Sequence, residues 1–133
     1  MLFAVAGSIN KTVFANGLGF ECPKNMKLLG YVSDEEAKTL MRDCKAFLFP
    51  TFYEGFGIPP LEALSVGCNR IIVTDSEVMH EVLENAATYI NPYFYHLPDS
   101  NGSSHKNIEK VLEKYSWKKS AEKLYELINC FRS

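Results

Sequence analysis

Short apolar runs and helical patterns of apolar residues alternate along most of the chain. Five runs bounded by turn residues predict strands, at 1–7 (MLFAVAG), 26–32 (MKLLGYV), 46–51 (AFLFPT), 71–75 (IIVTD) and 88–92 (TYINP). Apolar runs of this length between turn signals are typical of strands that are buried on both faces of a sheet.

A capping box predicts the first clear helix. Ser33 and Glu36 have the spacing at which each side chain satisfies the other residue's backbone amide at a helix start. The helix that they open covers 34–44, and its apolar residues recur with helical spacing, which predicts packing against the sheet. These residues are Ala37, Leu40, Met41 and Cys44.

The next two helices lie between the later strands. Pro59-Pro60 and Gly67 bracket a helix of about two turns, because proline is favoured in the first turn and glycine just past the last. A further helix is predicted over 76–87. His80 lies beside Glu81 within it, and we expect a partly exposed structural histidine there rather than an acid or base.

Strands that alternate with helices predict an α/β fold: a three-layer αβα sandwich with a mainly parallel, Rossmann-like sheet of about five strands. We assign 1–97 to this core, with a loop and a short helix at 8–21, 98–106 to a polar loop and 107–133 to two C-terminal helices. Apolar stripes of this kind are typical of core-facing helices, and we expect the two helices to pack on the core or to extend from it. The stripes are Ile108, Val111, Leu112 and Tyr115, then Trp117, Ala121, Leu124, Ile128 and Phe131.

Composition narrows the class of protein. A chain of 133 residues with 47% hydrophobic residues is long and apolar enough for one folded domain. Its net charge of −2 and its lack of a dense basic run predict no nucleic-acid partner. Four cysteines lie far apart in the sequence, at 22, 44, 68 and 130, which predicts reduced thiols of a cytoplasmic protein and no metal site.

The segment 51–62, between the third and fourth predicted strands, is where we expect a ligand. Ligands of open parallel sheets bind at the carboxyl ends of strands. Gly55 and Gly57 allow the backbone to approach a ligand closely. A helix N-terminus with free amides favours an anion such as phosphate. The candidate amide donors are those of Gly55, Phe56, Gly57, Ile58 and Leu61.

Two carboxylates flank these amides. Glu54 precedes them, and Glu62 falls in the first turn of a helix that begins near Pro59. A carboxylate repels phosphate, so both side chains are better suited to accept hydrogen bonds from the hydroxyls of a ribose or a hexose. Spacing alone leaves the alternative open that Glu54 is solvated and Glu62 only adds a favourable charge near the helix start.

The run FLFPTFYEGFGIPPLEALSVGC resembles the signature of family 4 (group 1) glycosyltransferases, retaining enzymes of the GT-B fold. The matching residues are Pro50, Thr51, Glu54, Gly55, Phe56, Gly57, Pro60, Glu62, Ala63 and Gly67. The resemblance continues upstream through LLGYVSDEEAKTLMRDCKAF and downstream through VTDSEVMHEVLENAATYINP and YSWKKSAEKL. It implies the C-terminal half of a GT-B enzyme, the half that binds the nucleotide-sugar donor.

The resemblance also implies roles for individual residues. Glu54 would be the catalytic residue that holds hydroxyls of the donor sugar, and Glu62 would hold the ribose hydroxyls. The base would lie near Tyr31 and Val32. The remaining expected donor-binding residues are Gly7, Thr51, Gly55, Phe56, Gly57, Ile58 and Leu61. The substrate would be a UDP-, GDP- or ADP-linked sugar, with no metal and no cofactor.

Two parts of such an enzyme have no match in the chain. One is the N-terminal domain that binds the acceptor. The other is the Arg and Lys pair that clamps the donor diphosphate, since Arg42, Arg70 and Lys11 lie elsewhere in the pattern. We therefore expect a hexosyltransferase part in polysaccharide or glycoconjugate synthesis, inactive alone, cytoplasmic or at the inner face of the membrane through the full-length enzyme.

Two other classes of protein are alternatives to a glycosyltransferase. A non-catalytic nucleotide-sugar-binding or assembly subunit would keep the same loop, and the sequence leaves that alternative open. A phosphoacceptor signalling domain needs acidic residues after its first strand and at the end of a middle strand. Gly7-Ser8 and Pro50-Thr51 occupy those places, which argues against that class.

Overall fold

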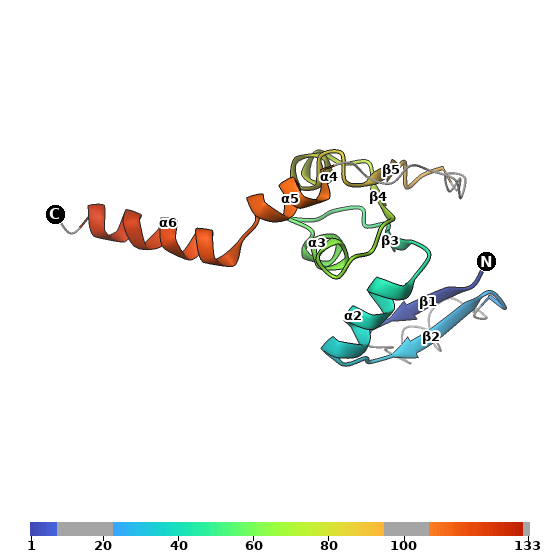
Figure 1. Ribbon diagram of the computed structural model, residues 1–133. Helices are drawn as coiled ribbons and strands as arrows, with labels where there is room; N and C mark the ends of the chain where they lie inside the picture. Colours follow the sequence, from blue (N-terminus) through green and yellow to red (C-terminus); the bar gives the residue numbers. More distant parts are fainter. Residues whose placement is uncertain (8–22, 95–106, 132–133) are drawn as a thin grey trace, which may run out of the picture. The chain divides into compact units, whose positions relative to one another are not determined.

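The computed structural model describes residues 1–7, 23–94 and 107–131 (Figure 1). The chain divides into two compact units, Met1–Leu40 and Met41–Ser133, and each is described here by itself. The loop and short helix expected at 8–21, and the polar loop expected at 98–106, lie outside the described residues.

The first unit contains two parallel strands, β1 (Phe3–Ala6) and β2 (Met26–Gly30). Phe3 is paired with Met26, and just after β1 the amide of Gly7 donates to the carbonyl of Gly30, the last residue of β2, at 2.8 Å. The carboxyl ends of both strands therefore lie side by side. The segment after β2 leads into helix α2 (Asp34–Asp43), which continues into the second unit at Met41.

The predicted capping box is confirmed at the start of α2. The Ser33 amide donates to Glu36 Oε2 at 2.8 Å, and the Glu36 amide donates to Ser33 Oγ at 3.3 Å. These hydrogen bonds to the carboxylate, from the Ser33 backbone first and then its hydroxyl, lower the pKa of Glu36. Two of the otherwise unpaired amides at a helix start are thus satisfied, which fixes the beginning of α2.

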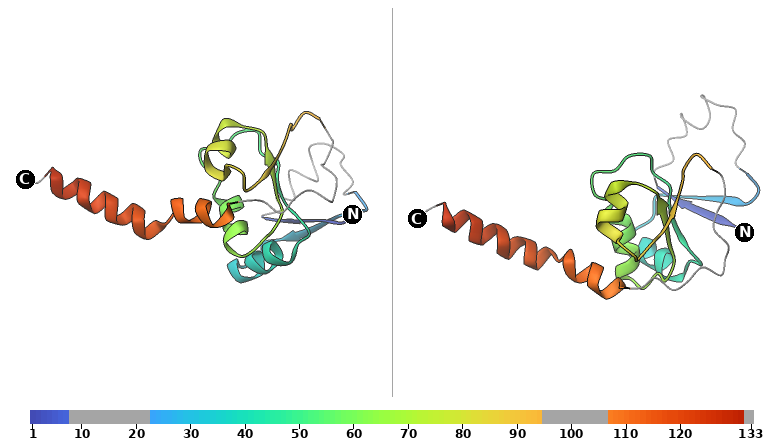
Figure 2. Two further views of the ribbon diagram at one scale, coloured as in Figure 1. Left: turned by 45° about the horizontal axis from the view of Figure 1, so that its top comes forward. Right: turned by 90° about the horizontal axis from the view of Figure 1, so that it is seen from above.

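The second unit contains the other three strands, β3 (Phe47–Phe49), β4 (Ile71–Thr74) and β5 (Thr88–Ile90). They form one parallel sheet in the order β3-β4-β5 (Figure 2), and every residue of the central strand is buried. All five predicted strands are confirmed, as is the parallel α/β class. Among the described residues they form two hydrogen-bonded sheets, one in each unit.

Three helices complete the core of the second unit: α3 (Ile58–Ser65), α4 (Glu77–Leu83) and α5 (Ile108–Lys114). The predicted apolar stripe of α5 is confirmed, because Val111 is fully buried and its neighbours on the stripe pack against the core. The buried cluster comprises Leu61, Ala63, Leu64, Cys68, Ile71, Val73, Met79, Val82, Leu83, Ala86 and Val111.

Helix α4 is shorter than the helix predicted over 76–87. Its C-cap Glu84 takes a φ of 48°, a left-handed conformation that ends the helix. The hydroxyl of Tyr89, on β5, donates to the Glu84 carbonyl at 2.6 Å and so holds this end in place. Burial, with a smaller contribution from Asp75, raises the pKa of Tyr89 to about 12.

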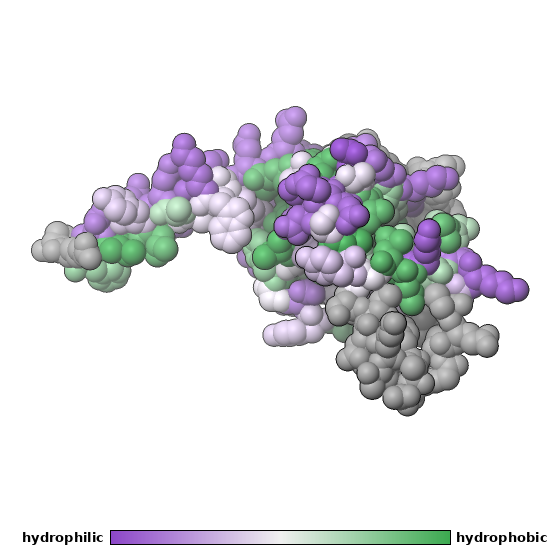
Figure 3. All heavy atoms as spheres, turned by 90° about the horizontal axis from the view of Figure 1, so that it is seen from below, coloured by the Kyte–Doolittle hydropathy of each residue, from purple (hydrophilic) through white to green (hydrophobic). Residues whose placement is uncertain are grey.

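Helix α6 (Trp117–Cys130), which we expect either to pack on the core or to extend from it, leaves its apolar stripe exposed. No residue of α6 is buried. Trp117, its first residue, is 85% exposed, and Phe131, which follows the helix, is 89% exposed. Hydrophobic atoms gather along one side of α6 and hydrophilic atoms along the other (Figure 3). The periodicity correctly predicts an amphipathic helix, but it carries no information about which surface covers the apolar side.

Among the described helices, none combines the length and the apolar character that crossing a bilayer requires.

Matched leucine substitutions test this assignment of the core. Leu83→Ala, at a fully buried position, is expected to lower the free energy of unfolding by about 2–5 kcal/mol. Leu124→Ala, at a position 58% exposed on α6, should change it by no more than about 0.5 kcal/mol. Urea unfolding followed by circular dichroism gives both values. A large loss for Leu124→Ala would show that α6 belongs to the core.

Candidate functional site

The β3–α3 loop (residues 50–57) begins at the carboxyl end of β3. Its residues differ in burial: Thr51 and Glu54 are half-buried, whereas Tyr53 is 92% exposed. The loop thus occupies the edge of the parallel sheet at which ligands of this architecture bind.

Gly57 makes the turn from this loop into α3. It is the N-cap residue, with a φ of 84° that side-chain-bearing residues rarely adopt. A Cβ at this position would also collide with the methyl and sulfur of Met79, which is buried on α4. Glycine is therefore favoured at 57 by the backbone conformation, and any side chain there would also require the end of the Met79 side chain to move.

The helix begins at Ile58, one residue earlier than the predicted start near Pro59. Glu62 is consequently its fifth residue, and no acidic residue lies in the first turn. The expectation of a carboxylate in the first turn is wrong. Glu62 is exposed on the next turn instead.

The helix start offers few free amides. Pro59 and Pro60 have no N–H, and no side chain caps the helix at Gly57. Leu61 is the first residue that can bond four positions back within the helix. Of the amide donors predicted in α3, that of Ile58 is the one without a helical carbonyl partner, while the amides of Gly55 and Phe56 belong to the loop.

The carboxylates of Glu54 and Glu62 have no hydrogen bond or ion pair within the described part of the chain. Both therefore retain acceptor oxygens for a ligand. Each belongs to the second unit, as do Thr51 and the loop amides, so the structure keeps these predicted residues on one connected segment.

Aromatic contacts hold the loop on two sides. The Phe56 ring packs edge-on against Tyr115, with centroids 5.1 Å apart, and the Tyr115 hydroxyl donates to the Glu81 carbonyl at 3.3 Å. Phe52 contacts Tyr93, which follows β5, at 5.6 Å. Tyr115 was expected only as a core residue, because nothing in its sequence position links it to a loop about 60 residues earlier.

A second polar pair lies at the same edge of the sheet. Asp75 directly follows β4, and its Oδ1 is 2.7 Å from Nε2 of His80, whose ring stacks on Tyr89 at 3.8 Å. The carboxylate partner of His80 is therefore Asp75 and not the adjacent Glu81. An acidic residue at the end of a buried strand is the sequence signal that would have identified this pair.

Two arginines, Arg42 and Arg70, lie in the described part of the second unit. Arg42 forms an ion pair with Asp43 at 2.8 Å. Arg70 precedes β4, and its backbone carbonyl accepts a hydrogen bond from the Phe47 amide. Arg70 therefore lies at the amino edge of the sheet, opposite the loop.

Lys114 lies over the Tyr115 ring at 5.1 Å, but its ammonium is already held. It donates to the Glu81 carbonyl at 3.1 Å and to the Glu84 carboxylate at 3.4 Å. The hydrogen bond with Tyr115 and then that with Glu84 raise the pKa of Lys114.

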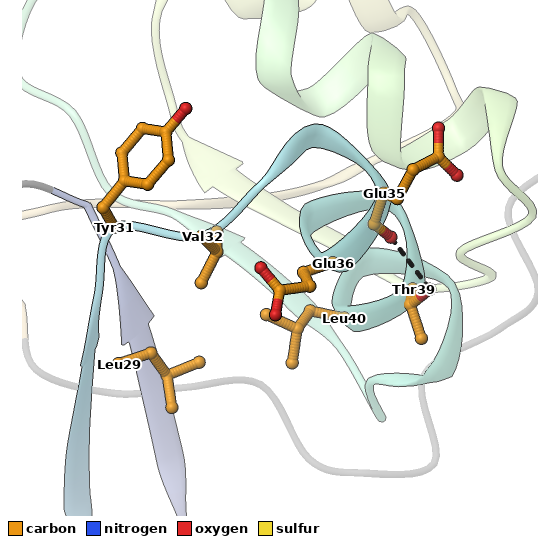
Figure 4. Close-up of a pocket in the computed structure, with 7 residues that line it drawn as sticks. All are labelled: Leu29, Tyr31, Val32, Glu35, Glu36, Thr39 and Leu40. Carbon is orange, nitrogen blue, oxygen red and sulfur yellow. Dashed lines mark hydrogen bonds between the residues drawn. The ribbon is translucent and has the colours of Figure 1, made fainter.

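The first unit carries the other predicted site residues around a hollow of about 530 Å³ (Figure 4). Tyr31 and Val32 line it from the segment after β2, and α2 closes the other side. Gly7 does not line this hollow but follows the neighbouring strand β1, where its amide donates a hydrogen bond to the Gly30 carbonyl. The complete lining is Leu29, Tyr31, Val32, Glu35, Glu36, Thr39 and Leu40.

Parallel strands that alternate with helices define a Rossmann-like α/β protein. Comparison with known families is more specific: residues 2–128 match the family described as "Glycosyl transferases group 1". The chain belongs to this family, and the resemblance seen in the sequence is confirmed.

Curated relatives match about half of the chain. The O-antigen chain mannosyltransferase RfbU of Salmonella typhimurium is 43% identical over 72 residues, 54% of this chain and 20% of that protein. O-antigen chain mannosyltransferase B of Escherichia coli is 37% identical over 67 residues, 50% and 17% of the two chains. The matched segments thus span a fifth or less of these relatives.

Substitutions at the two loop glycines test the preference for glycine at position 57. Gly57→Ala is expected to lower the free energy of unfolding by about 2–4 kcal/mol, because it adds left-handed strain and overpacks the core. Gly55→Ala, where a Cβ meets no atom within 4 Å, should change it by less than about 1 kcal/mol. Urea unfolding of both variants is the measurement.

A Met79→Ala background separates the two contributions. The loss caused by Gly57→Ala should shrink there to the backbone part, about 1–2 kcal/mol. An unchanged loss would contradict the contact between Gly57 and Met79.

Proposed function

We propose that this chain is the donor-binding half of a retaining glycosyltransferase of the hexosyltransferase type. The enzyme would move a sugar from a nucleoside diphosphate sugar to a glycan or lipid-linked acceptor in polysaccharide or glycoconjugate synthesis. The observation that carries the proposal is the β3–α3 loop. There, the carboxylates of Glu54 and Glu62, which have no partner among the described residues, lie before and after the amides of Gly55 to Ile58 in the sequence.

In this proposal, Glu54 accepts hydrogen bonds from hydroxyls of the donor sugar and Glu62 from those of the ribose. The amides of Phe56, Gly57 and Ile58 donate to the sugar and the diphosphate. They stabilise the negative charge that develops on the leaving nucleoside diphosphate, a form of electrostatic catalysis. The hollow beside Tyr31 and Val32 is the proposed place of the base.

Mannose is the proposed sugar, because the relatives compared above are mannosyltransferases. The nucleotide is left to experiment among UDP, GDP and ADP. A nucleotide-sugar donor places the reaction in the cytoplasm, and a lipid-linked acceptor would bring the full-length enzyme to the inner face of the membrane.

The isolated chain is expected to bind its donor weakly and to have no glycosyltransferase activity. The family's Arg and Lys pair has no counterpart here, and Arg42 and Arg70 are placed elsewhere. Two charge-assisted contacts at about 1.5–3 kcal/mol each correspond to about 10²- to 10⁴-fold in affinity. The acceptor would be bound by a further, N-terminal domain of the enzyme.

An NMR titration of the ¹⁵N-labelled chain tests donor binding. UDP, GDP and ADP, each free and linked to mannose, are added to millimolar concentration. One nucleotide is expected to shift the amides of Gly55 to Ile58, and it identifies the base. If no nucleotide moves these amides, the proposed donor site is wrong for this chain.

Two charge-removing variants separate the roles of the carboxylates. Glu62→Gln should weaken binding of the nucleotide and of the nucleotide sugar alike, by about 10- to 100-fold. Glu54→Gln should weaken only the nucleotide sugar. Glu109→Gln, an exposed residue of α5, is the control for the loss of one charge and should leave both affinities unchanged.

Catalysis is tested in an enzyme that joins this chain to an N-terminal acceptor-binding domain. Transfer with retention of the anomeric configuration, lost in Glu54→Gln, is the expected result, and inversion would contradict the retaining mechanism. Donor binding without transfer in the joined protein would favour the alternative, a non-catalytic nucleotide-sugar-binding or assembly subunit.

A further inference from the structure

Two cysteines that are 24 positions apart in the sequence meet in the second unit. The Sγ atoms of Cys44 and Cys68 are 3.8 Å apart, close to van der Waals contact. Cys68 is buried at 1% exposure within the core, and Cys44 is half-buried and packs against that core. The donor site proposed above uses neither thiol.

The surroundings of the pair suit bond formation between the two sulfurs. Cys44 follows α2, and Cys68 lies beyond the end of α3, so neither is fixed within a helix or strand. The two thiols donate weak hydrogen bonds to the carbonyls of Met41 and Arg70, at 3.1 and 3.4 Å. In the described part of the chain no third metal-ligating side chain joins them, which disfavours a metal site.

We propose that Cys44 and Cys68 form an intrachain disulfide when the chain meets a small-molecule disulfide such as glutathione disulfide. Cys44, the more accessible thiol, loses its proton and attacks glutathione disulfide, which releases one glutathione thiolate. Cys68 then loses its proton and attacks the Cys44 sulfur, releasing the second glutathione. The two protein thiols are oxidised, and one glutathione disulfide is reduced to two thiols.

Disulfide formation requires the two sulfurs to approach from 3.8 Å to the bonded distance of about 2.05 Å. The disulfide would join the end of α2 to the turn after α3, the helix that carries Glu62. A cross-link of this kind restricts the unfolded chain, so the oxidised protein should unfold at higher urea concentration.

The same burial makes the reaction slow at neutral pH. Burial first, and the neighbouring Cys68 second, raise the pKa of Cys44 to about 11. Because the thiolate is the attacking species, the rate should rise about tenfold for each pH unit between about 7 and 10.

The test uses the full chain with Cys22→Ser and Cys130→Ser, which removes the other two thiols. The protein is equilibrated with mixtures of reduced and oxidised glutathione, quenched in acid and analysed by mass spectrometry after proteolysis. The expected product is a monomer that has lost two hydrogen atoms and contains a Cys44–Cys68 linked peptide. Its midpoint of urea unfolding should lie above that of the reduced protein.

An equilibrium comparison links this product to the fold. The equilibrium constant for disulfide formation should be at least about tenfold larger in the folded chain than in the same chain in concentrated urea, because the fold holds the sulfurs together. Adding Cys44→Ser should abolish the loss of two hydrogens. Only single glutathione adducts, intermolecular dimers, or a folded-state constant no larger than that in urea would overturn the proposal.

Discussion

The close approach of Gly57 to Met79 is the constraint on which the β3–α3 loop depends. The left-handed backbone of Gly57 turns the chain into α3, and its missing side chain leaves room for the methyl group of Met79 on α4. The edge-on contact of Phe56 with Tyr115 holds the same turn from α5. Two helices thus fix the loop whose amides and carboxylates form the candidate site.

Features determined by neighbouring residues were predictable from the sequence. The capping box of Ser33 and Glu36 spans four residues, and the buried run at 71–74 is bounded by turn signals on both sides. The segment containing Glu54, Gly57 and Glu62 is likewise continuous, so one stretch of sequence contains the main elements of the candidate site. Local patterns of this kind need no knowledge of the tertiary arrangement.

Features that arise from long-range packing were not predictable in the same way. The approach of Cys44 to Cys68 depends on how α2 and α3 end against the core. The early end of α4 follows from the left-handed Glu84 and its bond to Tyr89. The apolar stripe of α6 predicts a helix correctly but not its exposure, because periodicity describes a face and not its partner.

From the position of the charges we expect this loop alone to make a weak site for a diphosphate. Arg70 lies at the amino edge of the sheet and Lys114 is held by Glu84, while the loop itself contributes two carboxylates. A diphosphate beside Glu54 and Glu62 meets a local excess of negative charge that a few amide dipoles only partly offset. Tight donor binding in the proposed enzyme therefore requires positive charge from outside the β3–α3 loop. The hydroxyl contacts of the two glutamates would then provide selectivity more than affinity.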